Sequence, residues 1–256
     1  MCFNVAIREW GVGGGVSDEP NIADGFDEMK LKTKFFTGLS VSFDLIECFL
    51  YEQSIGFRYL EDHLARLKKS AQIFNFIYKK NYIIKELNAL KSSLSPQKKY
   101  KIKIVLKKNG LVEGFYEELE PAICEKKYQV KISNTAVLTQ DNLLFGHKTT
   151  ASSVRDFYSK AYNQLDPKGK IFDIIFFNES GFLTEGTKTC IFVEKNNKLF
   201  TPALDCGVLP GVMRNKILQG KSTAKTAYLT KADLLSADKI WLANSVVGMV
   251  AAELLL

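Results

Sequence analysis

The sequence predicts an α+β protein built from two lobes. Its 256 residues are enough for one large domain or two smaller ones. Short segments of alternating polar and apolar residues indicate strands, while other segments repeat apolar residues at helical spacing. The character of the chain changes after Leu143. We therefore expect a smaller lobe over 36–145 and a larger lobe over 146–256, preceded by an N-terminal arm over 1–35 rich in Gly, Asp and Glu.

The first expected lobe begins with two short strands within 43–60, which flank a turn at Glu52–Ser54. A helix should follow, because apolar residues recur at steps of three and four along one face. That face comprises Leu60, Leu64, Leu67, Ala71, Phe74 and Tyr78. Acidic residues in the first turn, Glu61 and Asp62, suit the positive end of a helix dipole.

A second helix is expected over Ile83–Leu94, ending before Pro96. Two alternating strands should follow at 99–108 and 125–133, with Asn109-Gly110 as a turn after the first.

The second expected lobe starts from strands within 173–178 and 188–202, which Gly181 and Asn196-Asn197 interrupt. The segment "LPGVMRNKILQG" indicates a loop that leads into a helix ending near Gly220. A closing pair of strands is expected over 239–255.

Composition excludes several classes of protein. At 46% hydrophobic and 25% charged residues, the chain is typical of a soluble globular protein. No segment approaches the roughly 18 apolar residues of a membrane span, and "MCFNVAIREWG" does not resemble a signal peptide. Five scattered cysteines without CxxC spacing and only two histidines predict reduced cytoplasmic thiols and no metal site.

The net charge of +7 is local, because twelve lysines lie between Lys68 and Lys108. A basic stripe of this kind is one argument for a non-catalytic nucleic-acid-binding module. However, the lysines alternate with apolar residues in "YKIKIVLKK", which favours the solvated face of a strand and no nucleic-acid partner. The positive field would also attract a small anionic substrate.

Two residues of the second lobe are candidates for chemistry. Lys148 lies among small polar residues in "FGHKTTASS", and is either solvated or an amine held in a pocket for Schiff-base chemistry. Glu185 lies between two apolar runs in "NESGFLTEGTKTCIF". A carboxylate in such surroundings needs a cationic partner, either a lysine or a protonated ring nitrogen.

An anion site is the other candidate. The backbone amides of Val212 and Met213, at the expected helix start, would point at an anion or simply belong to a loop-to-helix junction. Arg58, at a strand end, would bind a phosphate or pair with Glu61 or Asp62.

The order of these segments resembles one enzyme family. The motifs are "R-x-x-x-x-H-L-x-R-L-x-x-S-A", "H-K-T-T", "N-E-x-G-x-L-T-E-G-T", "L-x-T-P-x-x-x-x-G-V-L-P-G-V-x-R" and "A-N-S-V-x-G". Together they resemble the class IV pyridoxal-phosphate aminotransferases, from about Phe43 to the end of the chain. The resemblance implies the two-lobed fold of D-amino-acid and branched-chain aminotransferases, with the active site between the lobes.

The resemblance also implies roles for particular residues. Lys148 matches the catalytic lysine that binds pyridoxal 5'-phosphate covalently, and Glu185 matches the acid on the pyridine nitrogen. Arg58 and Ser245 match phosphate contacts through their side chains, and Val212 and Met213 match phosphate contacts through their amides. An amine, an acid, an arginine and an anion-binding helix start together suit this cofactor.

Within the family, "FDLIE", "HKTT" and "NSVVG" are most similar to the lyase branch. This implies cleavage of 4-amino-4-deoxychorismate to 4-aminobenzoate and pyruvate in folate biosynthesis, by a cytoplasmic homodimer. The alternative is an aminotransferase for branched-chain or D-amino acids. Because the substrate carries two carboxylates, Lys107 and Lys108 are weak candidates for binding it.

Three positions depart from the lyase pattern. Arg155 and Tyr158 lie a few residues late, after an insertion "ASS" that follows "HKTT". Cys190 stands where the family usually has Asn, and Val247 where the lyase branch often has Arg. The insertion bears on activity itself, and the two substitutions bear on the substrate.

The arm contains "WGVGGGVSDEP", which lacks the GK[ST] of a phosphate-binding P-loop. Residues 1–35 instead resemble the tail of aminodeoxychorismate synthase component I. This likeness supports the same substrate and leaves open a synthase partner or a larger fusion; a flexible arm is the alternative interpretation.

Overall fold

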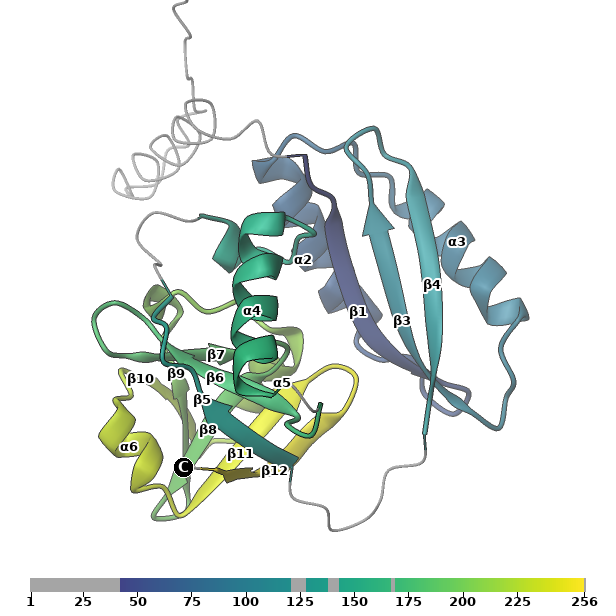
Figure 1. The fold of residues 1–256 in the computed structure, drawn as a ribbon. Helices are drawn as coiled ribbons and strands as arrows, with labels where there is room; N and C mark the ends of the chain where they lie inside the picture. The colour runs from purple at the N-terminus through teal and green to yellow at the C-terminus, as the bar shows by residue number, and fades with distance from the viewer. Residues whose placement is uncertain (1–41, 121–127, 138–142, 167–168, 256) are drawn as a thin grey trace, which may run out of the picture. The chain divides into compact units, whose positions relative to one another are not determined.

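A computed structural model of the protein describes residues 42–120, 128–137, 143–166 and 169–255 (Figure 1). The expected arm over 1–35 therefore lies outside the described residues. From Phe43 onward the chain forms one structural unit. Two sheets organise it, and the mixture of helices and sheets confirms the α+β class.

The first sheet is antiparallel, with strand order β2-β1-β3-β4. Its strands are β1 (Leu45–Glu52), β2 (Gly56–Phe57), β3 (Lys99–Leu106) and β4 (Val112–Leu119). The turn between β3 and β4 contains Asn109-Gly110, and Gly110 adopts a φ of 84°. A side chain is disfavoured at that φ, which explains why glycine stands there.

Two helices accompany this sheet, α2 (Leu60–Ile73) against β1 and α3 (Lys80–Ser92) against β4. Helix α2 buries Leu64, Leu67 and Ala71 of the expected apolar face, together with His63 and Ser70, while Leu60 is partly buried. It ends five residues before the expected Tyr78, because Asn75 takes a left-handed φ of 55°. Phe74 is nevertheless buried, so the apolar pattern continues past the end of the helix.

The second sheet has eight strands in the order β10-β9-β8-β11-β12-β5-β6-β7. Their bounds are β5 (Tyr128–Ile132), β6 (Asp173–Phe177), β7 (Leu183–Gly186), β8 (Cys190–Lys195), β9 (Lys198–Pro202), β10 (Ala224–Ala227), β11 (Lys239–Asn244) and β12 (Gly248–Leu254). Strand β5 lies parallel to both β12 and β6. The expected division at 145/146 had placed this segment in the first lobe, whereas its strand pairing is with the second.

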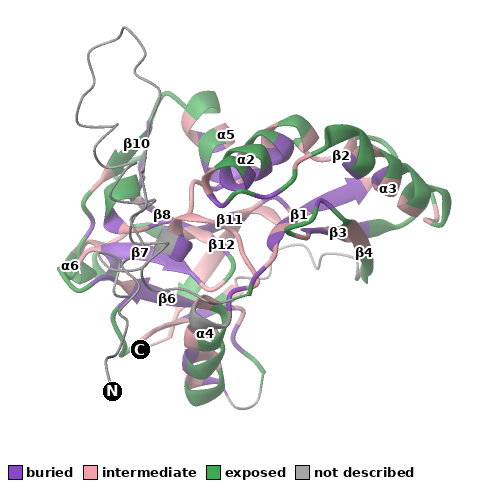
Figure 2. Cartoon of the chain, turned by 90° about the horizontal axis from the view of Figure 1, so that it is seen from above, coloured by how far each residue is buried: buried purple, intermediate pink, exposed green. Residues whose placement is uncertain are grey.

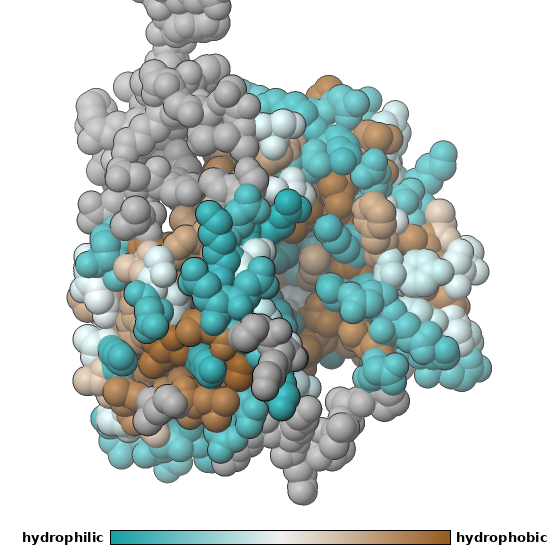
Figure 3. All heavy atoms as spheres, in the orientation of Figure 1, coloured by the Kyte–Doolittle hydropathy of each residue, from teal (hydrophilic) through white to brown (hydrophobic). Residues whose placement is uncertain are grey.

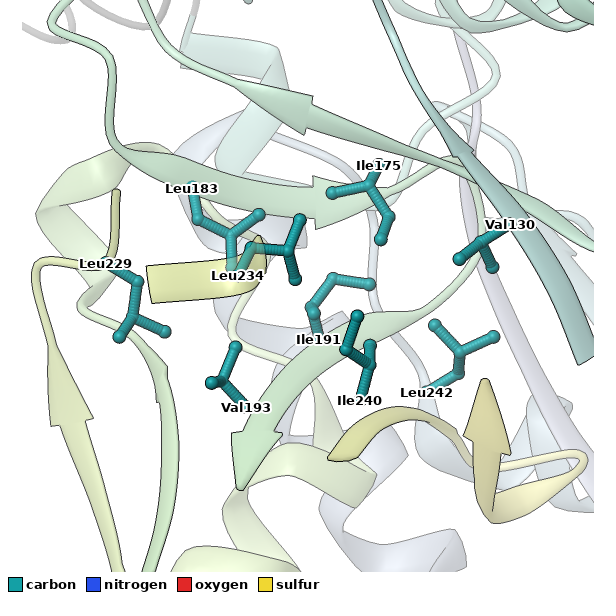
Figure 4. Close-up of a cluster of buried hydrophobic side chains, with 9 residues drawn as sticks. All are labelled: Val130, Ile175, Leu183, Ile191, Val193, Leu229, Leu234, Ile240 and Leu242. Carbon is teal, nitrogen blue, oxygen red and sulfur yellow. The ribbon is translucent and has the colours of Figure 1, made fainter. Parts of the chain in front are cut away.

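Helices cover both faces of the second sheet. They are α4 (Ser152–Leu165), α5 (Val212–Gly220) and α6 (Lys231–Leu235), with 3-10 turns at Leu143–Gly146 and Leu204–Cys206. Along β8, Ile191 and Val193 face a cluster of buried aliphatic side chains (Figure 4), while Phe192 packs on the α5 side. The alternation of side chains along a strand produces these two cores.

In Figure 2 buried residues lie along strands such as β1, β6 and β8, and β12 is of intermediate exposure, whereas helices α2, α3 and α4 turn exposed residues outward. On the face shown in Figure 3, hydrophilic residues are interspersed with hydrophobic ones. No helix among the described residues is long and apolar enough to cross a membrane.

Strand β1 connects the two sheets. The backbone N–H of Ile46 donates to the Lys148 carbonyl at 2.9 Å, and the N–H of Thr150 donates to the Asp44 carbonyl at 2.9 Å. Further along β1, the N–H of Leu50 donates to the Ser245 carbonyl at 3.1 Å. One strand of the first lobe therefore fixes two candidate site segments of the second.

Candidate active site

Lys148 lies in a short extended segment that runs antiparallel beside the start of β1. Thr149 forms a bridge with Leu45, and the Thr150 hydroxyl accepts from the Asp44 N–H at 2.8 Å. The backbone on both sides of Lys148 is thus fixed, while its side chain is only partly buried. A lysine on a fixed backbone with an accessible amine suits covalent chemistry.

Glu185 lies on β7 and is buried. Its Oε1 accepts from the Tyr158 hydroxyl at 3.1 Å, and its Oε2 accepts from the Leu209 N–H at 3.0 Å. Burial raises the pKa of Glu185 to about 7, although both hydrogen bonds and the charge of Lys148 act to lower it. Among the described residues, no ion pair includes this carboxylate. The site therefore provides a buried acid whose direct donors are neutral.

Asp173, at the start of β6, fixes the turn that follows Glu185. Its buried carboxylate accepts from the Thr187 N–H at 2.8 Å and from the hydroxyls of Thr187 and Thr189 at 2.5 and 2.6 Å. A Cβ at Gly186 would lie 2.4 Å from Asp173 Oδ2, so only glycine fits beside the carboxylate. These contacts of Asp173 fix the end of β7 and, with it, the position of Glu185.

Val212 and Met213 are the first two residues of α5, as the sequence predicts. Gly211 precedes them, and no described side chain caps this end of the helix. The amides of the first turn have no partner within the helix, and the helix dipole adds positive potential there. The end of α5 can therefore bind an anion.

Cys190 packs against this helix start. A Cβ at Gly211 would lie 2.6 Å from the Cys190 Sγ, so the glycine lets the thiol approach the backbone. Burial raises the pKa of Cys190 to about 12, which keeps the thiol neutral. The residue that replaces the usual Asn thus packs closely against the start of α5.

Arg58 follows β2 and reaches the turn between β11 and β12. Its Nη1 donates to the Val246 carbonyl at 3.2 Å. Ser245 is buried in the same turn, and Asn244 Oδ1 closes that turn by accepting from the N–H groups of Val246 and Val247, each at 2.9 Å. Arg58 therefore contacts the turn that contains Ser245. Val247 belongs to the same turn and donates its backbone N–H to Asn244.

The two lysines expected to bind substrate have partners of their own. Lys107 pairs with Asp44 at 2.9 Å and with Glu113 at 3.3 Å. Lys108 donates to the Phe74 carbonyl at 2.7 Å and lies 5.2 Å from the centre of the Phe76 ring. Their role in carboxylate binding stays a prediction that these contacts do not support.

Other lysines of the basic segment also pair with acids. Lys98 contacts Glu118 and Lys101 contacts Glu117 across β3 and β4. These lysines are therefore partly neutralised by acids, and the absence of a nucleic-acid partner stays a prediction. Of the two late residues after the lysine, Tyr158 contacts Glu185 whereas Arg155 is exposed and lies 4.0 Å from Asp156.

Sequence reasoning missed two parts of the site. One is the role of Asp173, and the other is a buried cluster of Glu47, His63 and Arg66. A signal for the second was present, because Glu47 occupies the buried face of an otherwise apolar alternating strand. His63 and Arg66, three residues apart, share the helix face turned toward it.

Comparison with known proteins identifies the family. The family model described as amino-transferase class IV matches residues 44–254. The chain belongs to the class IV aminotransferases. This result confirms the expected family and fold type, and members of the family depend on pyridoxal phosphate.

Individual relatives point to both branches of the family. A Schizosaccharomyces pombe protein provisionally named an aminodeoxychorismate lyase is 25% identical over 205 residues, covering 79% of this chain and 85% of that protein. The aminodeoxychorismate lyase of Vibrio harveyi is 31% identical over 129 residues, covering 49% of this chain and 46% of that protein. A crystal structure from Mesorhizobium loti, provisionally named an amino-acid aminotransferase, has a TM-score of 0.75 and 30% identity, covering 83% of this chain and 100% of that one.

The described residues fit the family's cofactor. A buried carboxylate with only neutral direct donors suits a protonated pyridine nitrogen, because a cation in contact would offset the cost of ionising Glu185 in a buried site. The uncapped start of α5 suits a phosphate, as does an arginine at the β11–β12 turn. The donor set thus matches both charged ends of pyridoxal phosphate.

Proposed function

We propose that this protein is a pyridoxal-phosphate-dependent lyase that cleaves 4-amino-4-deoxychorismate to 4-aminobenzoate and pyruvate. The observation that carries the proposal is its similarity to lyases, namely the Vibrio harveyi enzyme and the provisionally named Schizosaccharomyces pombe protein. The motifs "FDLIE" and "HKTT" support the same branch.

In this proposal Lys148 holds the cofactor through its side-chain nitrogen, and Glu185 pairs with the pyridine nitrogen. The amides of Val212 and Met213, with Arg58 and Ser245, hold the phosphate. When bound, pyridoxal phosphate supplies an electron sink for carbanion chemistry. The residues around it have to fix its orientation and keep its ring nitrogen protonated.

The proton chemistry belongs to Lys148. The amine of the substrate first replaces the Lys148 Nζ on the cofactor, and the freed Nζ then takes the proton from the amine-bearing ring carbon of the substrate. The C–O bond to the enolpyruvyl group then breaks, the ring becomes aromatic, and the released enolpyruvate takes up a proton to become pyruvate. Aromatisation makes this direction favourable, and the backbone bonds on both sides of Lys148 keep the amine in register with the reacting carbon.

An aminotransferase on the same scaffold is the second candidate, favoured by the 30% identity to the Mesorhizobium loti protein. A coupled assay separates the two. Chorismate, an ammonia source and a separate synthase generate the lyase substrate, and fluorescent 4-aminobenzoate with equimolar pyruvate supports the lyase. Glutamate-dependent turnover of keto acids, without 4-aminobenzoate, would replace the lyase proposal with the aminotransferase.

The lysine is tested directly by borohydride reduction of the protein loaded with pyridoxal phosphate, followed by peptide mass analysis. We expect the mass increase on the peptide that contains Lys148, and its absence in Lys148→Ala. Lys107→Gln is the matched control, because it removes another lysine and should leave the labelling unchanged. Label on a different lysine would refute the assignment.

We further propose that the protein is a cytoplasmic homodimer that accepts a small anionic substrate. The arm over 1–35 is proposed as a contact for an aminodeoxychorismate synthase, because of its resemblance to the synthase tail. Light scattering after size exclusion measures the oligomer. A pull-down with the synthase, using this protein with and without its residues 1–35, tests whether the arm binds the synthase.

A further inference from the structure

Glu47, His63 and Arg66 form a buried charged cluster that the proposed reaction does not use. Glu47 lies on β1, and the other two lie on α2. Arg66 donates to both oxygens of Glu47, from Nε at 2.9 Å and from Nη2 at 2.6 Å. His63 Nδ1 lies 2.7 Å from Glu47 Oε2. Burial acts to raise the pKa of Glu47, but the charge of Arg66 and the hydrogen bonds outweigh it and lower that pKa to about 2.

The cluster needs an explanation other than stability. Taking a carboxylate and a guanidinium out of water costs free energy that their attraction often only offsets, so a buried ion pair is weak support for a stabilising role. What such a pair does provide is geometry, because a bidentate guanidinium has a fixed plane. The Nη1 donor of Arg66 is therefore aimed in one direction.

That donor reaches the loop before α5. Arg66 Nη1 donates to the Pro210 carbonyl at 3.2 Å. The preceding residue, Leu209, donates its N–H to Glu185, and the following residue, Gly211, immediately precedes α5. The N–H of Gly211 also donates to the Leu209 carbonyl at 2.7 Å, so residues 209–211 form a tight turn. Residues 209–211, here termed the bridge segment, are thus connected to the first lobe, to Glu185 and to the start of α5.

We propose that Arg66 is a positioning residue for the phosphate of the cofactor. Glu47, which His63 contacts, holds the guanidinium. The guanidinium holds the Pro210 carbonyl, and the bridge segment thereby sets the direction of the Val212 and Met213 amides. This inference rests on the proposed cofactor site. Through Arg66 the first lobe orients the phosphate-binding amides, and Arg66 itself need not touch the cofactor.

The chain offers a matched control. Lys216 of α5 pairs with Asp62 of α2 at 2.9 Å, so it joins α2 to helix α5 itself at a more exposed place. This pair does not involve the bridge segment. Lys216→Gln removes a contact between α2 and α5 while leaving Arg66 and Pro210 together.

The experiment measures the affinity of the cofactor-free protein for pyridoxal phosphate and for pyridoxal, which lacks the phosphate, by absorbance titration. We expect Arg66→Gln to weaken pyridoxal phosphate binding about tenfold, the effect of losing one charge-assisted hydrogen bond. Pyridoxal binding should change far less, and Lys216→Gln should change neither. Arg66→Lys keeps the charge without the planar fork, and should still weaken pyridoxal phosphate binding.

A second measurement follows the amides themselves. Hydrogen exchange of residues 209–215 in the cofactor-free protein should be faster in Arg66→Lys than in Lys216→Gln. Unchanged pyridoxal phosphate affinity in both Arg66 variants, or equal weakening for the two ligands, would overturn the role of Arg66. Failure of the unaltered protein to bind pyridoxal phosphate would instead overturn the cofactor site itself, and this role with it.

Discussion

Replacing Glu185 with Gln should remove a pH dependence from the stability of the cofactor-free protein. Burial raises the pKa of this carboxyl from 4.5 to about 7. An unfolded chain ionises it near 4.5, so the folded state loses relative stability as pH rises from 4.5 through about 7. The difference between the two pKa values corresponds to about 3 kcal/mol, present below the lower value and lost above the higher one.

The assay is urea unfolding of cofactor-free wild-type protein and Glu185→Gln at pH 5 and pH 8. Gln has one acceptor oxygen where Glu has two, so it loses the bond from Tyr158 or from Leu209 and costs about 1 kcal/mol at every pH. The change with pH is therefore the informative quantity. Other titrating groups occur in both proteins and cancel. Relative to wild type, the variant should gain up to about 3 kcal/mol between the two pH values. Parallel pH profiles would refute the claim that burial controls this carboxyl.

Three other results follow from the structure. Phe192→Ala empties a fully buried position on β8 and should lower the free energy of unfolding by about 3–5 kcal/mol, whereas Phe115→Ala at an exposed position should cost under about 1 kcal/mol, both measured by urea unfolding. Thr230→Ala removes the capping box of α6 and should cost about 1 kcal/mol by the same assay; an unchanged midpoint would contradict the cap. Burial lowers the pKa of His147 from 6.5 to about 4, so the free energy of unfolding should fall as the pH falls from 6.5 to 4. A His147→Gln variant with the same loss of stability in acid would exclude His147 as its cause.

Local elements were predictable because their signals are local. The strands around Glu52–Ser54, the turn at Asn109-Gly110 and the start of α5 at Val212 each depend on a few neighbouring residues, whereas strand β4 after that turn was not predicted. Strand β5 shows the limit. Its alternation identified it as a strand, but its partners β12 and β6 are distant in sequence, and periodicity does not state which strands pair.

The residues of the candidate site also divide into those with a local sequence signal and those without one. Lys148, Glu185 and Arg58 are predicted from motifs, as is the helix start at Val212, which the structure confirms. Asp173 and Arg66 act through contacts with residues far away in the chain, Thr187 and Pro210, which no single segment reveals. A buried charge on an apolar strand face, as at Glu47, is the sequence feature that can direct attention to such partners.

The position of β12 in the second sheet has a consequence for how the protein is made. Among the described strands, β12 is the one that pairs with both β11 and β5, so the strand pairing of the sheet is continuous only once β12 is in place. Residues 128–186 leave the ribosome long before that strand does. In the interval β5 lacks its partner β12 and presents an unpaired edge, which is a template for association between nascent chains. Substitutions in β12 should therefore reduce the yield of folded protein more than they reduce the activity of the molecules that do fold.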